Sequence, residues 1–227
     1  YMYIGPQGIV HGTTITILNA CRKLNANTEH NDLKLFVSSG LGGMSGAQPK
    51  AAGIAGVISV IAEVNPKAIK TRYSQGWVDE VISDKDKLIS RVIEAKKENR
   101  VISIAYHGNI VDLWEELSHS NIRVDIGSDQ TSLHNPWAGG YYPAGISFEE
   151  SNRMISSDPE KFKELVRESL RRQVKAINLH CERGTYFFDY GNAFLLEASR
   201  AGANILDSSG EFRYPSYVQD IMGPMFF

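Results

Sequence analysis

The sequence has few of the features that mark secreted, membrane or metal-binding proteins. Its two cysteines, Cys21 and Cys181, lie far apart and outside the CxxC and Cys/His spacings of metal sites. We therefore expect reduced, buried thiols in an intracellular protein. No apolar run reaches the roughly 18–20 residues of a membrane span, and no charged-then-apolar leader is present. These absences predict a cytoplasmic protein with no membrane partner.

Charge of one sign is also scarce, because 24 basic and 26 acidic residues leave a net charge of −2. Neither sign forms a long block, so nucleic acid and anionic membrane surfaces are not expected as partners. The chain has no internal repeat and no low-complexity segment. Its 227 residues, of which 42% are hydrophobic, suffice for one large domain with a sizeable core.

Familiar catalytic patterns are missing as well. No Ser/His/Asp order, pair of carboxylates or His-x-x-x-His motif stands out above background. A glycine cluster is present, but it does not end in Gly-Lys-Ser/Thr, which argues against a nucleoside-triphosphate P-loop. The sequence therefore predicts a ligand site without an evident catalytic apparatus of its own.

A strand–glycine–helix–strand–acid unit is the strongest positive signal. Residues 33–38 read as a strand and residues 45–56 as a helix, and four glycines (40, 42, 43 and 46) lie at the turn between them. Their spacing is one residue longer than the usual dinucleotide fingerprint. Glycines let a phosphate approach the backbone and the positive end of the following helix. Glu63 ends the next strand, 21 residues after Gly42, close to the offset of about 20 expected for an acid that accepts from ribose hydroxyls.

The rest of the chain alternates strands with helices, which predicts a doubly wound, Rossmann-like α/β fold. The sheet should be mostly parallel, with helices on both faces and helical additions at the C-terminal end. Residues 1–12 read as a loop or a short edge strand, and 217–222 as a last short element. Further strands are expected at 77–82, 101–106, 123–126 and 203–207. Further helices are expected at 13–24, 67–73, 84–99, 110–119, 147–156, 160–182 and 192–201.

Polar residues and glycines gather where the predicted strands end, which is where ligands bind in such sheets. The densest group follows the strand at 123–126 and runs from Asp129 to Tyr142. Its amides and hydroxyls would suit a carboxamide and a ribose, and its tyrosines would suit stacking on a ring. His134 and His107 could each act as an acid or base, but a hydrogen-bond donor role is the simpler interpretation.

Five long motifs make the chain similar to the central part of the urocanases, especially the eukaryotic-type members. These motifs are YIGPQGIVHG (3–12), GLGGMSGAQP (40–49), GSDQTSLHNPWAGGYYP (127–143), FDYGN (188–192) and YPSYVQDIMG (214–223). The resemblance implies an enzyme of histidine degradation that adds water to urocanate, giving 4-imidazolone-5-propanoate. It also implies tightly bound NAD, whose oxidised ring acts as an electrophile and not as a hydride carrier. A homodimer is implied for the full-length enzyme.

The residue pattern and the resemblance together give a set of predicted NAD contacts and no catalytic residue. Tyr190 enters only through the resemblance, since its own surroundings would place it in the core. The predicted contacts are Gly42, Gly43, Met44, Ser45, Glu63, Asn109, Ile110, Gln130, Thr131, Ser132, Leu133, His134, Tyr141, Tyr142 and Tyr190.

Two departures from the family pattern limit what the resemblance implies. Ser45 replaces a glycine found in many bacterial members, and we expect this small residue to fit and its hydroxyl to help. The chain stops at Phe227, before the arginine expected to hold substrate and before the catalytic cysteine, a role that neither Cys21 nor Cys181 matches. We therefore expect residues 1–227 to form a single NAD-binding domain, inactive alone, that is inserted in a longer enzyme. A conventional NAD-dependent dehydrogenase domain and a non-catalytic nucleotide-binding module stay as alternatives.

Overall fold

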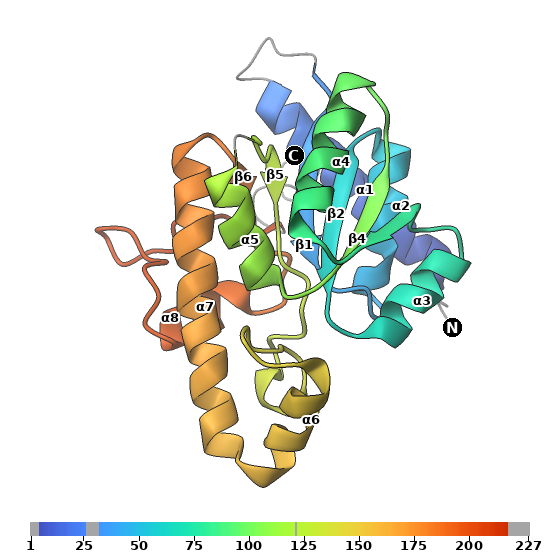
Figure 1. Cartoon of the computed structure of the whole chain (residues 1–227). Helices are drawn as coiled ribbons and strands as arrows, with labels where there is room; N and C mark the ends of the chain where they lie inside the picture. The colour runs from blue at the N-terminus through green and yellow to red at the C-terminus, as the bar shows by residue number, and fades with distance from the viewer. Residues whose placement is uncertain (1–4, 26–31, 121, 218–227) are drawn as a thin grey trace.

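A six-stranded parallel sheet lies at the centre of the computed structural model, which describes residues 5–25, 32–120 and 122–217 (Figure 1). The strand order is β3-β4-β2-β1-β5-β6, and all five pairings between neighbouring strands of this sheet are parallel. The predicted doubly wound sheet is therefore confirmed. The strands are β1 (Leu35–Ser39), β2 (Ile58–Glu63), β3 (Glu80–Ile82), β4 (Ser103–His107), β5 (Ile126–Gly127) and β6 (Tyr186–Phe187).

The strand order reverses at the centre of the sheet, between β1 and β5. The chain moves outward from β1 to β2 and to β3 at the edge, steps back to β4 between them, and then crosses to the other side of β1 to form β5 and β6. Connections above and below the sheet diverge at such a point and leave a crevice at the carboxyl ends of the two strands. The topology therefore places the segments after β1 and β5 at the usual ligand position of this fold.

The helices agree closely with the predicted ones, because the residues expected to cap their N-termini do so in the structure. Asn109 and Ser147 act as the expected N-caps: their side-chain oxygens accept from the N–H groups of Val111 and Glu150 at 2.9 Å and 3.1 Å. The helices are α1 (Pro6–Asn25), α2 (Gln48–Ala55), α3 (Pro66–Ser74), α4 (Lys85–Lys97), α5 (Ile110–His119), α6 (Phe148–Ser157), α7 (Pro159–Glu182) and α8 (Phe194–Arg200); short 3-10 turns precede α2 (Ser45–Ala47) and α6 (Pro136–Ala138).

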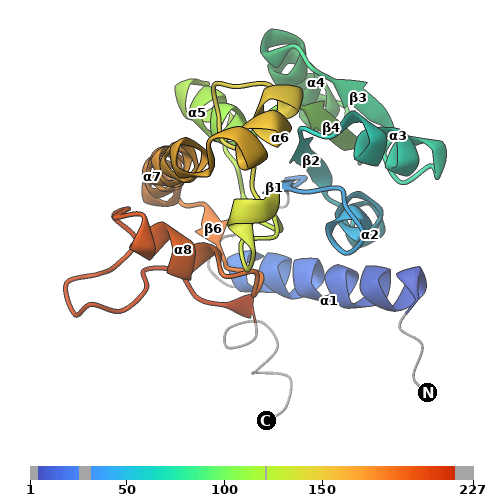
Figure 2. The ribbon, with the colours of Figure 1, turned by 90° about the horizontal axis from the view of Figure 1, so that it is seen from below.

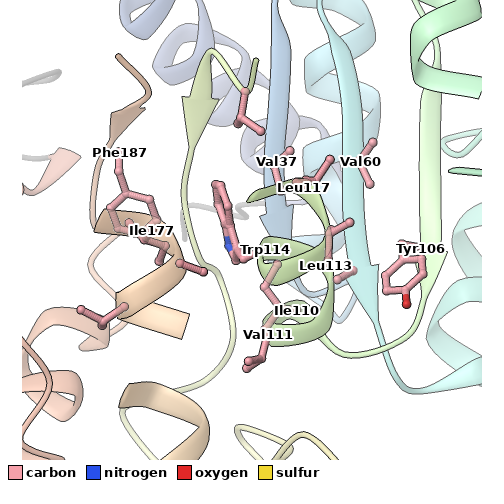
Figure 3. Close-up of a cluster of buried hydrophobic side chains, with 14 of the residues drawn as sticks. Val37, Val60, Tyr106, Ile110, Val111, Leu113, Trp114, Leu117, Ile177 and Phe187 are labelled. Atoms are coloured by element: carbon pink, nitrogen blue, oxygen red, sulfur yellow. The ribbon is translucent and has the colours of Figure 1, made fainter. Parts of the chain in front are cut away.

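Two apolar clusters hold the helices to the two faces of the sheet. Helices α1 and α2 cover one face, whereas α4, α5 and α7 cover the other (Figure 2). Figure 3 shows the centre of the larger cluster, where Trp114 of α5 lies between the sheet and α7, near Phe187 and Ile177. Burial on both sides explains why β1, β2 and β4 are almost continuous apolar runs.

Helix α6 and the first half of α7 extend beyond the carboxyl edge of the sheet (Figure 1). They support the long segment between β5 and α6, which crosses the strand ends before the chain returns along α7. The sheet therefore positions the glycine turn after β1, while α7 supports the segment that faces it. Among the described residues, no helix is both long enough and apolar enough to cross a membrane.

Five segments differ from the sequence prediction, and one of them is the strand expected at 123–126, of which only Ile126 lies in β5. Residues 6–12, expected as a loop or edge strand, are the first turns of α1, because packing of α1 on α2 outweighs the low helix propensity of its glycines. Residues 203–207 form no strand but one isolated bridge, Leu206 with Phe212. The short strand β6 was not predicted, and β3 covers only the end of 77–82. Residues 1–4 and 218–222 of the predicted elements lie outside the described ranges.

Candidate functional site

A pocket of about 210 Å³ opens at the carboxyl edge of the sheet, where β1 and β5 diverge. Four chain segments meet there: the glycine turn after β1, the end of β2, the turn after β4 and the segment after β5. Ten of the predicted contacts line it, namely Gly42, Ser45, Glu63, Asn109, Ile110, Gln130, Thr131, Ser132, Tyr141 and Tyr142.

The other five predicted contacts do not line this pocket. Gly43 and Met44 lie at the exposed tip of the glycine turn, with 69% of Met44 accessible to solvent. Leu133 is fully buried in the core, and His134 is exposed on the outer side of its loop. Tyr190 is half-buried, and its ring stacks on Tyr217 with centroids 4.9 Å apart. The core position inferred for Tyr190 from its own surroundings agrees with this packing.

The glycine turn is held in shape by Ser45. Gly40 has φ +90°, and a Cβ built there would lie 2.8 Å from Ser45 Oγ and 3.1 Å from the Gln130 carbonyl oxygen. A larger residue at position 40 would therefore push the two sides of the pocket apart. The N–H of Gly42 donates to Ser45 Oγ at 3.0 Å. The Ser45 hydroxyl thus fits the turn and stabilises it.

Glu63 connects the end of β2 to the glycine turn. Its Oε2 accepts from the Leu41 N–H at 2.8 Å, and its Oε1 accepts from the Asn65 N–H at 2.9 Å. A carboxylate oxygen can accept two hydrogen bonds, so each oxygen keeps capacity for a ligand hydroxyl. The position of Glu63 on the pocket wall therefore fits the ribose-binding role predicted for it.

Asp129 begins the densest polar group of the sequence but was not among the predicted contacts, and the structure shows that it organises the site. It is fully buried directly after β5, and its Oδ2 accepts from Ser39 Oγ at 2.7 Å and from Gln173 Nε2 at 3.0 Å. Its Oδ1 accepts from both the N–H and the hydroxyl of Thr131 and from Asn192 Nδ2. Five donors thus satisfy one buried carboxylate, as burial of a charge requires. The network joins β1, α7 and the segment before α8 to the pocket wall.

The two tyrosines of the loop have different environments. Tyr141 is fully buried and its hydroxyl donates to Gln173 Oε1 at 2.7 Å, so its ring is part of the core. Burial raises the pKa of Tyr141 well above its ordinary value. Tyr142 is half-buried, lines the pocket and donates to Asn152 at 3.0 Å, while its carbonyl accepts from Asn109 Nδ2 at 2.9 Å. The stacking role predicted for both tyrosines is thus geometrically open to Tyr142 alone.

One buried polar atom of the pocket wall has an unused capacity to donate a hydrogen bond. Gln130 Nε2 is buried on the wall and makes no well-formed hydrogen bond to a described residue, although the Tyr190 hydroxyl lies near enough for Gln130 to offset part of the rise in the pKa of Tyr190 that burial causes. A buried donor without a partner is costly, which indicates a position that a ligand acceptor would satisfy. The described residues contain no group of three or more His, Cys, Asp or Glu side chains suited to a metal ion.

Comparison with known proteins agrees with this arrangement. Residues 5–221 match the family model described as the urocanase Rossmann-like domain. The chain belongs to the urocanase family. It is 60% identical to a probable urocanate hydratase of Dictyostelium discoideum, 55% to one of Caenorhabditis elegans and 56% to urocanate hydratase of Homo sapiens. Each alignment covers 100% of this chain and 34% of the relative, so the chain spans about a third of their length.

One buried carboxyl next to the site of this urocanase domain should make stability depend on pH. Asp189 is 8% exposed, and burial raises its pKa from 3.8 to about 6. Because the folded state binds the Asp189 proton more tightly than the unfolded state does, this group favours folding fully at a pH below 3.8, its ordinary pKa. That stabilisation is lost as the pH rises through about 6. We expect the Asp189→Asn variant to gain stability relative to the unaltered chain between pH 4 and pH 7, by about 1–3 kcal/mol.

Urea titrations of both proteins at pH 4, 5, 6 and 7 would measure this difference. Asp86→Asn, a change at an exposed carboxyl in the first turn of α4, serves as the control. A stability difference between Asp189→Asn and the unaltered chain that stays constant with pH would contradict the raised pKa.

Proposed function

We propose that this chain is the NAD-binding part of a urocanate hydratase, which adds water to urocanate to give 4-imidazolone-5-propanoate. One observation carries the proposal: the pocket at the β1/β5 crevice combines a glycine turn, a carboxylate after β2 and amide and hydroxyl groups after β5. These are the groups that a pyrophosphate, a ribose and a nicotinamide carboxamide require. Relatives that are 55–60% identical to this chain bear the name of this activity.

The groups present on the pocket wall fit a dinucleotide. Glu63 keeps acceptor capacity for ribose hydroxyls after bonding to the backbone. Gln130 offers a buried donor that makes no well-formed hydrogen bond in the described part of the chain. In that same part, the N–H groups of Gly43, Met44 and Ser45 donate to no acceptor, although Gly43 and Met44 lie outside the pocket lining. NAD needs such acceptors and donors, so we assign the ribose to Glu63, the phosphates to the turn and the carboxamide to the region of Gln130.

The described residues would bind and orient the cofactor and leave the reaction itself to other parts of the enzyme. When bound, NAD+ would supply an electron-withdrawing ring that makes the substrate open to attack by water. The Asp129 network would keep the segment Gln130–Ser132 in place, and Tyr142 would cover one side of the pocket. The homodimer and the cytoplasmic location expected for the full-length enzyme belong to the same proposal.

The function can be tested on the full-length protein after purification. We expect NAD to be released when the protein is denatured, and mass spectrometry would identify it. We further expect the ultraviolet absorbance of urocanate to fall on mixing with the enzyme, without the absorbance of NADH appearing. Formation of NADH with a hydroxy-acid or alcohol substrate would indicate a dehydrogenase instead, and lack of any turnover with NAD bound would favour a non-catalytic module.

A substitution at Glu63 tests the ribose site. Glu63→Ala removes an acceptor for the ribose and also the bond to the Leu41 N–H, so we expect NAD binding to weaken by about 1–3 kcal/mol. Isothermal titration calorimetry on cofactor-free protein would measure the change. Glu116→Ala, on the outer side of α5, serves as the control and should bind NAD normally. Unchanged affinity for Glu63→Ala would remove Glu63 from the site.

A further inference from the structure

Arg72 of α3 reaches across to the glycine turn, 30 residues earlier in the chain. Its Nε donates to the carbonyl of Leu41 at 3.1 Å, and its Nη2 donates to the carbonyl of Gly42. On its other side, the guanidinium lies 5.3 Å from the ring of Trp77, and Nη1 donates to Gln75 at 2.8 Å. Arg72 is therefore held in one orientation, with two adjacent donors on two consecutive carbonyls of the turn.

The contact between Arg72 and the turn explains why position 46 is a glycine. This glycine makes the spacing one residue longer than that of the usual dinucleotide fingerprint. A Cβ built on Gly46 would lie 2.0 Å from Arg72 Nε and 2.6 Å from its Cζ. Any side chain at position 46 would therefore displace the guanidinium. The glycine at 46 is therefore required for the close approach of the half-buried Arg72 to the turn.

The two carbonyls held by Arg72 determine the direction of the next two N–H groups. In a planar trans peptide the N–H points opposite to the preceding C=O. The Gly42 N–H therefore points away from Arg72, and it donates to Ser45 Oγ. The Gly43 N–H points away from Arg72 as well, and no described residue accepts from it. The Gly46 N–H also donates to the Gly42 carbonyl, at 3.0 Å, so Arg72 and the start of the helix together keep a donor of the turn free for an external acceptor.

The positive charge of Arg72 also favours an anionic ligand at the glycine turn. Among the described residues, no carboxylate forms an ion pair with it, so its positive charge is not neutralised locally. Burial lowers the pKa of Arg72, but an arginine stays protonated at neutral pH. A partly desolvated cation beside a glycine turn raises the local potential for anions.

We propose that Arg72 is a positioning residue of the dinucleotide site, which orients the glycine turn and favours the pyrophosphate without lining the pocket itself. This inference rests on the proposed function, because it requires that a dinucleotide binds at the turn. It assigns a role to a residue on the helix after β2, and it gives the turn two supports: Ser45 from within and Arg72 from outside.

The test compares ligands with and without phosphate on the cofactor-free, full-length protein. We expect Arg72→Met to weaken the binding of NAD and ADP about tenfold to a hundredfold, as loss of charged hydrogen bonds would, and to leave adenosine binding unchanged. Lys70→Met removes the same charge from an exposed position of α3 and should bind all three ligands normally. Thermal unfolding of both variants should stay within a few degrees of the unaltered protein, because Arg72 is only half-buried and a methionine can keep the packing of its aliphatic stem.

Arg72→Lys separates positioning from charge. A lysine keeps the charge but cannot donate from a fixed fork to two carbonyls, so we expect it to recover little of the lost affinity. Full recovery with lysine, or equal loss of adenosine and NAD binding in Arg72→Met, would overturn the positioning role. Normal NAD binding by Arg72→Met would also overturn it and leave the proposed function intact. Failure of the unaltered protein to bind NAD would overturn both.

Discussion

Asp129→Ala should destabilise the folded domain by about 3–4 kcal/mol, one of the two largest effects expected of any single substitution discussed for this chain. The change removes the acceptor of five hydrogen bonds from a fully buried position. Ser39, Gln173 and Asn192 would each keep a donor without its partner, and a buried unsatisfied donor costs about 1–3 kcal/mol. The total loss of stability should be smaller than the sum of these separate penalties, because the Ser39 hydroxyl and the Gln173 and Asn192 amides can reorient.

The same substitution should abolish measurable NAD binding, since Asp129 holds the Thr131 backbone in the pocket wall. Urea unfolding followed by circular dichroism would give the stability change, and calorimetry would give the affinity. Asp129→Asn keeps the shape but places an amide against donors, so an intermediate loss is expected. Asp86→Ala, at an exposed carboxyl of α4, should change neither quantity by more than about 0.5 kcal/mol. Wild-type stability in Asp129→Ala would show that the network contributes little.

Trp114→Ala should cost about 3–5 kcal/mol of unfolding free energy, as expected for a large buried aromatic residue. Trp114 is fully buried, with its ring centroid 5.1 Å from that of His180 and 6.3 Å from that of Phe187. A Cβ on Gly127 would lie 2.8 Å from the indole, so the sheet itself contacts the ring. Removal of the ring would leave a cavity between α5, α7 and β5 (Figure 3).

Trp114→Phe provides the matched comparison. The indole Nε1 is buried without a hydrogen-bond partner in the described residues, so phenylalanine removes an unsatisfied donor together with some volume. We expect a loss of about 1–2 kcal/mol for this variant. Ile93→Ala, on the exposed side of α4, should cost less than about 1 kcal/mol. Equal losses for the alanine and phenylalanine variants would contradict the cavity argument.

Helix and strand order could be predicted from the sequence because its signals are local. Asn109 and Ser147 mark helix starts through their own backbone neighbours, and the helix at 110–119 has the predicted bounds. Glu63 and the glycines of the turn also lie within one strand–helix–strand unit, so their spacing alone brings them together. Where the chain departs from local propensity, as in the glycine-containing start of α1, the prediction was wrong.

The parallel α/β fold, the family and the segments that form the pocket follow from the sequence alone, since hydrophobic period, helix caps and motifs are properties of neighbouring residues. The packing of distant segments placed Tyr141 in the core, let Asp129 join β1, α7 and the segment before α8 to its own loop, and brought Arg72 to the glycine turn. Those contacts join residues 30 to 90 positions apart. Their partners depend on how helices and strands pack, because burial makes each polar group find whichever partner the fold brings within reach.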